Sequence, residues 1–212
     1  MNKNSSLRWA IFFLIAFFFV AVNLNDVSVL QNDSNVGEYV VDHQISWLND
    51  ICVVLSFMFE PLYVALFIFL LGLFLWIKKY SDEAIFFVFV SSFSGALIYL
   101  LKHIFVRARP AIQFLAETGY SFPSGHALIS VVLYGSLIYF SSKLKSLGVK
   151  ICLISFSILG ILILGLSRVY LNVHWFSDII GGYFLGATIL FFGIFLYQVN
   201  IFQKLVNLFY PK

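Results

Sequence analysis

Three short stretches of this sequence gather charged and polar side chains between long apolar runs. The richest covers residues 167–178 and holds Arg168, His174 and Asp178. An ionisable group in such a place is costly unless it is paired or used in chemistry. His174 and Asp178 are four residues apart, so on a helical turn they share one face and the carboxylate can hold one ring nitrogen. The other nitrogen is then free to act as a nucleophile or a base.

A second polar stretch, residues 102–110, supplies positive charge. Lys102 and Arg109 are seven residues apart, so they share a face if the preceding helix continues outward. Pro110 favours an end to that helix just before Arg109. Several cations that face one water-filled pocket indicate a polyanionic ligand, and phosphate is the commonest candidate.

The third stretch, residues 123–126, reads Pro-Ser-Gly-His and opens a predicted helix. Free backbone N–H groups and the helix dipole make such a start an anion site. Ser124 can donate its hydroxyl, Gly125 lets a ligand approach the backbone closely, and His126 lies at the bound group. The three stretches, including Arg168 of the first, together predict a single anion site.

Each stretch alone has an ordinary structural explanation. Lysines and arginines at a helix end commonly extend toward the membrane surface, a Ser-Gly pair commonly starts a helix, and a lone histidine commonly fills space. A His-Asp pair beside three cations and a second histidine is hard to explain as packing. Arg107 and Glu117 are interpreted as loop charges outside the site.

Composition predicts an integral membrane protein. Of 212 residues, 61% are hydrophobic and only 11% are charged, against about a quarter charged in soluble domains. A soluble all-helical domain is the alternative, and it would need more buried apolar segments than so small a core can hold. The net charge of +3 and the lack of a like-charge run indicate no nucleic-acid partner.

The apolar runs predict an all-α fold, a six-helix membrane bundle that forms one domain over residues 1–212. The first run, preceded by Lys3 and Arg8, also fits a cleavable signal peptide, but its small-residue cleavage site is poor, which favours an uncleaved helix. The expected spans are residues 9–22, 61–77, 84–101, 123–140, 149–166 and 179–197.

Residues 23–50 form an acidic external segment, with five carboxylates and no Lys or Arg. Helical periodicity over residues 40–59 predicts a helix that lies at the interface or leads into the second span, with a kink at Pro61. We hypothesise that this segment covers or shapes the entrance to the site.

The positive charges predict the orientation. With both termini cytoplasmic, the cytoplasmic segments contain nine of the thirteen Lys and Arg residues, as the positive-inside rule expects. The other four are Lys102, Arg107, Arg109 and Arg168, so the site is expected at the outer membrane face.

These residues resemble a known signature. The three stretches are similar, at every position and in spacing, to the three-part signature of the type 2 phosphatidic acid phosphatase (PAP2) superfamily. The resemblance covers a core of about residues 61–197. Within the family, the chain is similar to small bacterial membrane members that include phosphatidylglycerophosphate and undecaprenyl pyrophosphate phosphatases. The signature residues are Lys102, Arg109, Pro110, Pro123, Ser124, Gly125, His126, Ser167, Arg168, His174 and Asp178.

The resemblance implies hydrolysis of a phosphate ester through a phosphohistidine, with no metal and no other cofactor. It implies that His174 attacks phosphorus with Asp178 orienting it, and that His126 protonates the leaving group. It also implies a phosphate-binding set made of Lys102, Arg109, Ser124, Gly125 and Arg168. Preorganised cations suit the charge that spreads over the phosphoryl oxygens.

The expected substrate is a lipid phosphate whose chains stay among the membrane lipids. Phosphatidylglycerophosphate is the first choice, followed by undecaprenyl pyrophosphate and phosphatidic acid. A vanadate-dependent haloperoxidase, an anion-binding transporter and a purely structural membrane protein are the alternatives; charges deep within the spans or paired broken helices would favour a transporter. The sequence leaves the oligomeric state open.

Overall fold

The computed structural model describes residues 2–209, and over that range the chain folds into nine α-helices without a β-strand. The expectation of an all-α fold is therefore confirmed. The helices are α1 (Lys3–Val22), α2 (Val27–Asp42), α3 (Ser46–Met58), α4 (Pro61–Ile77), α5 (Ser81–Phe105), α6 (Gly125–Ser141), α7 (Leu147–Tyr170), α8 (Phe176–Gln198) and α9 (Ile201–Phe209).

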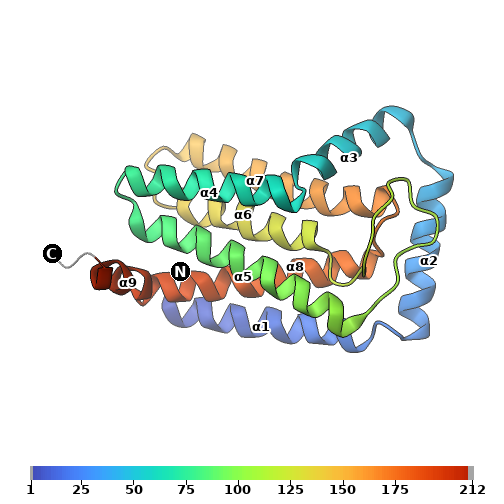
Figure 1. The fold of residues 1–212 in the computed structure, drawn as a ribbon, viewed down its shortest axis with the longest axis horizontal. Helices are drawn as coiled ribbons and strands as arrows, with labels where there is room; N and C mark the ends of the chain where they lie inside the picture. Colours follow the sequence, from blue (N-terminus) through green and yellow to red (C-terminus); the bar gives the residue numbers. More distant parts are fainter. Residues whose placement is uncertain (1, 210–212) are drawn as a thin grey trace.

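Six of these helices run along the long axis of the molecule, and each overlaps one of the predicted spans (Figure 1). They are α1, α4, α5, α6, α7 and α8. Helix α2 crosses one end of this bundle, where the loop of residues 106–124 also lies. The start of α1 and helix α9 lie at the opposite end (Figure 1).

The predicted count of six helices needs correction, because α2, α3 and α9 are added to the bundle in the described part of the chain. By length and apolar composition, four helices are each able to cross a membrane: α1, α5, α7 and α8. The bent pair α3 and α4 makes a fifth if it counts as one span. Helix α6 has 17 residues, about 25 Å of rise, against roughly 30 Å of hydrocarbon.

The first helix is an integral part of the bundle. Helix α1 packs along α8 and buries Ala10, Phe17 and Ala21. The Phe17 ring stacks on that of Phe122, with the ring centroids 5.7 Å apart. That α1 is retained and not cleaved stays a prediction.

Helices α3 and α4 meet at an angle of 54°. Pro61 occupies the first turn of α4, where its missing N–H group costs no hydrogen bond. The predicted kink at Pro61 is confirmed, and α3 leans away from the bundle on the same side as α2 (Figure 1).

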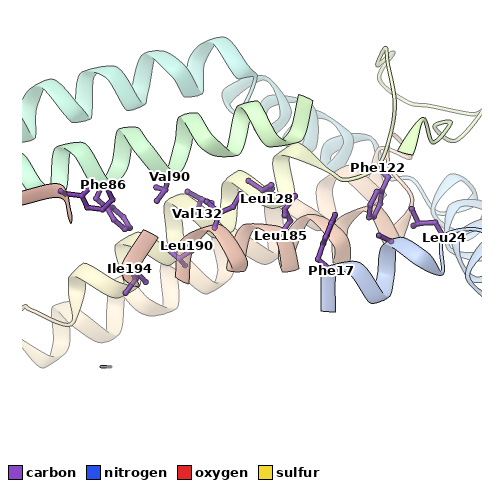
Figure 2. Close-up of a cluster of buried hydrophobic side chains, with 13 residues drawn as sticks. Phe17, Leu24, Phe86, Val90, Phe122, Leu128, Val132, Leu185, Leu190 and Ile194 are labelled. Atoms are coloured by element: carbon purple, nitrogen blue, oxygen red, sulfur yellow. The ribbon is translucent and has the colours of Figure 1, made fainter. Parts of the chain in front are cut away.

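The main core lies where α5, α6 and α8 meet (Figure 2). Val90, Leu128, Val132, Leu185 and Leu190 are at most 6% exposed. Lipid is as apolar as these side chains, so the helices associate in a membrane through close van der Waals packing. This core therefore holds the three helices that carry much of the candidate site.

Helices α6 and α8 approach each other at two glycines spaced four residues apart, the small-residue pattern that allows close contact between membrane helices. A Cβ atom at Gly182 would lie 2.6 Å from the carbonyl oxygen of Ser124, and one at Gly186 would lie 2.7 Å from that of Leu128. The Ser124 N–H also donates to the carbonyl oxygen of Asp178 over 3.1 Å. The starts of α6 and α8 are therefore fixed relative to each other.

The start of α6 is recessed below the end of α5. A Cβ atom at Gly125 would lie 3.8 Å from the side chain of Ile98, yet α5 continues to Phe105. Seven further helical residues correspond to about 10 Å of rise. The N-terminus of α6 thus forms a floor inside the end of the bundle.

Candidate active site

The predicted site residues converge at the end of the bundle that α2 crosses, and they come from four helices and two loops. The helix α5 supplies Lys102, α6 begins at the cap Ser124, and α7 supplies Arg168 from its last turn. The full predicted set is Lys102, Arg109, Ser124, Gly125, His126, Arg168, His174 and Asp178.

His174 and Asp178 form the predicted pair, although His174 lies just before α8 and not within it. Trp175 is the N-cap of α8, and the Asp178 carboxylate reaches back to accept from the Trp175 N–H over 3.0 Å. The same oxygen, Oδ2, lies 3.3 Å from His174 Nδ1. The carboxylate is therefore held by the helix start that it caps.

Arg109 determines which ring nitrogen of His174 carries the proton. Its Nη1 lies 3.2 Å from His174 Nε2 and 2.7 Å from the Val173 carbonyl oxygen. A guanidinium group only donates, so Nε2 accepts and the Nδ1–H donates to Asp178. Burial lowers the pKa of His174 well below its ordinary value of 6.5, and the nearby charge of Arg109 lowers this pKa further. His174 is thus a neutral imidazole with its Nε2 lone pair facing the cations.

The predicted cations surround this nitrogen from different elements. Lys102 Nζ donates to the Tyr120 carbonyl oxygen over 2.7 Å. Helix α5 ends at Phe105 with Val106 in the left-handed region, φ 49°, so Arg109 approaches from the loop. The expectation that the helix ends just before Arg109, with both cations on one face, is wrong because the chain turns three residues earlier.

Arg168 is fully buried, at 0% exposure. Its guanidinium group donates to Ser56 Oγ and to Glu117 Oε1. Within the described residues its Nε has no hydrogen-bond partner. A buried N–H without a partner is uncommon, and in a cluster of cations it is a donor that a bound anion would satisfy.

The start of α6 completes the cluster. Ser124 is fully buried and its Oγ accepts from the Ala127 N–H over 3.4 Å, and Gly125 opens the helix. His126 Nε2 lies 3.3 Å from the carbonyl oxygen of Ser56. Because a carbonyl only accepts, Nε2 of His126 carries a proton, which makes this side chain a possible acid.

The interpretation of Glu117 as a loop charge is wrong. Its carboxylate accepts from Arg168 and lies 3.5 Å from Arg109 Nη2. Burial raises the pKa of the Glu117 carboxyl, but the charges of Arg168 and Arg109 outweigh burial and hold this pKa below its ordinary value. The physical reason is charge balance, because buried guanidinium groups need a carboxylate nearby.

The interpretation of Arg107 as a loop charge is also wrong. Its Nη1 donates to Asp178 Oδ1 over 2.6 Å and to Ser177 Oγ over 2.7 Å, and its Nη2 donates to Asp33 Oδ2 over 2.7 Å. Asp33 belongs to α2 and is 3% exposed. The absence of Lys and Arg from residues 23–50 was a usable signal, since a buried carboxylate there needs a cation from another element.

Helix α2 contacts the site end at a second point. A Cβ atom at Gly37 would lie 3.1 Å from Asn172 Oδ1, in the turn between α7 and α8. Residues 23–50 therefore lie on the same side as the site, and their role in shaping the entrance stays a prediction. Within residues 2–209, His, Cys, Asp and Glu side chains form no group of three or more that could hold a metal ion.

The sequence model of the PAP2 superfamily matches residues 83–202, a range that contains every predicted site residue. The chain belongs to the PAP2 superfamily. In this PAP2 protein the matched range begins two residues inside α5 and contains everything from there to the end of α8, including the loop that joins α5 to α6. The family assignment therefore rests on the elements that build the site.

Two curated relatives and one solved structure are similar to this PAP2 protein. It is 27% identical over 185 residues to phosphatidylglycerophosphatase B of Bacillus subtilis, covering 85% of this chain and 89% of the relative. It is 27% identical over 199 residues to undecaprenyl-diphosphatase of Sulfolobus acidocaldarius, covering 84% and 88%. The crystal structure of a transmembrane PAP2-type phosphatidylglycerolphosphate phosphatase from Bacillus subtilis superposes with a TM-score of 0.80 at 23% identity, covering 88% and 94%.

Proposed function

We propose that this protein is a metal-independent lipid phosphate phosphatase that works through a phosphohistidine. The observation that carries the proposal is the state of His174. It is a buried neutral imidazole whose Nδ1–H points to Asp178 and whose Nε2 lone pair faces Arg109. A nucleophile prepared in this way beside several cations suits attack on a phosphoryl group.

In the proposed reaction, Lys102, Arg109 and Arg168 hold the phosphoryl oxygens together with the Ser124 hydroxyl and the Gly125 N–H. His174 Nε2 forms a bond to phosphorus while the bond from phosphorus to the leaving oxygen breaks. Asp178 stabilises the charge that develops on the imidazole.

His126 acts as the acid and then as the base. It enters the reaction as the imidazolium and gives one ring proton to the leaving oxygen, becoming the neutral imidazole, so the product lipid departs as a neutral alcohol or as a phosphate. A water molecule then gives a proton to His126 and attacks phosphorus, which breaks the bond to His174 and releases phosphate. The cycle returns both histidines to their starting protonation states.

The substrate we propose is phosphatidylglycerophosphate, hydrolysed to phosphatidylglycerol and phosphate. The name of the Bacillus subtilis relative supports this choice, and the name of the archaeal relative supports undecaprenyl pyrophosphate as the alternative. Phosphatidic acid is the third candidate. The site lies at one end of an apolar bundle, so a lipid can present its phosphate there while its chains stay in the membrane.

We further propose six spans formed by α1, the pair α3 and α4, and α5 to α8, with both termini cytoplasmic and the site at the outer face. The distribution of positive charge supports this orientation, since the end opposite the site holds Lys78, Lys79, Lys143 and Lys145.

The test is phosphate release by the purified protein in detergent with EDTA, from each of the three lipids. We expect release by the wild type and a loss on the order of 10⁴-fold or more for His174→Ala, the size seen when a catalytic nucleophile is removed. His43→Ala, which changes an exposed histidine of the α2–α3 turn, serves as the matched control and should stay active. Full activity of His174→Ala would overturn the mechanism, and no turnover of any lipid would favour an anion-binding transporter.

A further inference from the structure

The two carboxylate oxygens of Asp178 have different partners. Oδ2 faces His174 Nδ1 and the Trp175 N–H, at 3.3 Å and 3.0 Å. Oδ1 faces Arg107 Nη1 at 2.6 Å. A carboxylate held from both sides cannot rotate about its own axis, so Arg107 fixes the direction from which Oδ2 meets the imidazole.

Arg107 is itself held in place by α2. Its Nη2 donates to Asp33 Oδ2 over 2.7 Å, and its Nη1 donates to Ser177 Oγ over 2.7 Å. The Ser177 hydroxyl donates a hydrogen bond to Asp33 Oδ2 over 2.5 Å, and the Ser177 N–H donates to Asp33 Oδ1 over 2.9 Å. The guanidinium carbon also lies 5.8 Å from the centre of the Trp175 ring.

Arg107, Asp33 and Asp178 form one buried charged group. Arg107 places one positive charge between two carboxylates, and the side chains of Arg107, Asp33 and Asp178 are 11%, 4% and 0% exposed. Removing one member of a buried charged network leaves its partners uncompensated. Arg107 is bound on the Asp178 side of the imidazole, whereas Arg109 lies on the opposite side, at Nε2.

We propose that Arg107 and Asp33 are positioning residues for the His174–Asp178 pair, and that α2 takes part in catalysis through them. This inference rests on the proposed function. Arg107 keeps Asp178 ionised and aimed at Nδ1, which keeps the lone pair on Nε2. Asp33 holds Arg107 and links the outer helix α2 (Figure 1) to the nucleophile.

The experiment compares Arg107→Gln, Arg107→Lys, Asp33→Asn and the double variant Asp33→Asn/Arg107→Gln, with Glu38→Gln as the matched control. Glu38 is an exposed carboxylate on the same helix. For each protein, kcat and KM for the lipid phosphate are measured, together with inhibition by vanadate, a phosphate mimic. The ¹⁵N chemical shifts of the His174 ring report its tautomer without any turnover.

For Arg107→Gln we expect kcat to fall about 10- to 100-fold, the range for residues that orient a catalytic group through hydrogen bonds. KM and vanadate inhibition should stay near the wild-type values, and the His174 ring should show both tautomers. Arg107→Lys should be faster than Arg107→Gln but slower than the wild type, because an ammonium group lacks the planar set of N–H donors with which a guanidinium group contacts two carboxylates. Asp33→Asn should cost less, and its effect should vanish in the Arg107→Gln background.

Three results would overturn the inference: a change in KM or vanadate inhibition with kcat unchanged, additive losses in the double variant, or an unchanged tautomer in every variant. Reduced yield and thermal stability with a normal kcat would show a structural role only. If the wild type hydrolyses no lipid phosphate, the proposed function fails, and the ¹⁵N shifts alone decide whether Arg107 and Asp33 position His174.

Discussion

The proposed chemistry depends on a neutral histidine held among positive charges. Burial makes the neutral form of His174 favourable, and Arg109 then places a donor against its lone pair. A cluster of buried cations is unstable unless a carboxylate balances it, and Glu117 supplies that charge next to Arg109 and Arg168. The same arrangement predicts how the reaction rate depends on pH.

We expect the acid limb of the kcat/KM profile to lie below pH 6.5, the ordinary pKa of histidine. Protonation removes the lone pair of His174, so activity falls as the pH drops through its lowered pKa. Arg109→Gln removes a positive charge and should move this limb to higher pH, while lowering the rate by about 10²- to 10³-fold. The titratable or charged groups facing His174 are Lys102, Arg109, His126, Arg168 and Asp178.

The measurement is a pH profile of kcat/KM with one lipid phosphate, so that ionisation of the substrate is common to both proteins. A limb that stays in place in Arg109→Gln would contradict the electrostatic explanation.

Among individual residues, the sequence predicted those candidate site residues that lie in compact local motifs. It missed Asp33, Ser56, Arg107 and Glu117 as partners in the site. The partner of Asp33 is 74 positions away in Arg107, and the contact between Ser56 and Arg168 joins residues 112 positions apart. Spacing along the chain carries no information about such contacts until the helices are packed.

Among the elements, the contact between α6 and α8 matters most for the site. The phosphate-binding start of α6 and the His174–Asp178 pair at the start of α8 belong to different helices. Their relative position depends on glycine at positions 182 and 186, where a side chain would meet backbone atoms of α6. Backbone atoms cannot move aside as a flexible side chain can, so the two helix starts would have to separate.

We therefore expect Gly182→Ala to destabilise the protein by about 1–3 kcal/mol, the usual cost of overpacking, and to reduce phosphate release. The control is Gly95→Ala in α5, where an added Cβ meets nothing within 4 Å and alanine favours the helix by about 1 kcal/mol. Thermal unfolding in detergent and phosphate release are measured for both. Equal behaviour of the two variants would refute the role of the α6–α8 contact.

The sequence predicted the helices of the bundle well and their ends less well. The span expected at residues 84–101 extends over Ser81–Phe105, because polar residues continue a helix beyond the apolar run. Helix α2 was not predicted over Val27–Asp42. Its sequence is polar, and contacts of Asp33 and Gly37 with the site end hold it in place, which only the folded chain reveals.

The whole molecule has two chemically different ends. One carries α2, the loop of residues 106–124 and the candidate site, and the other carries the start of α1 and α9 (Figure 1). Within residues 2–209, the Lys and Arg side chains other than Arg107 and the predicted site residues gather at the second end or in the connections near it. This polarity favours one insertion direction in a membrane.

Labelling of single introduced cysteines tests the direction of insertion in the membrane. In a background where Cys52 and Cys152 are replaced by alanine, we expect Ala111→Cys to react with a membrane-impermeant maleimide on intact cells. Lys145→Cys should react only after lysis. Both positions are exposed and lie in connections at opposite ends of the bundle. The reverse labelling pattern would place the candidate site on the cytoplasmic side.

The recessed start of α6 has a consequence for the kinetics. The floor of the candidate site lies about 10 Å inside the end of α5, so under the proposed function the scissile phosphate descends toward the bilayer while the rest of the lipid stays in its own leaflet. The enzyme therefore meets its substrate by diffusion in two dimensions. Its saturation is governed by the fraction of lipids that are substrate, and diluting the membranes in water leaves the turnover of each enzyme molecule unchanged.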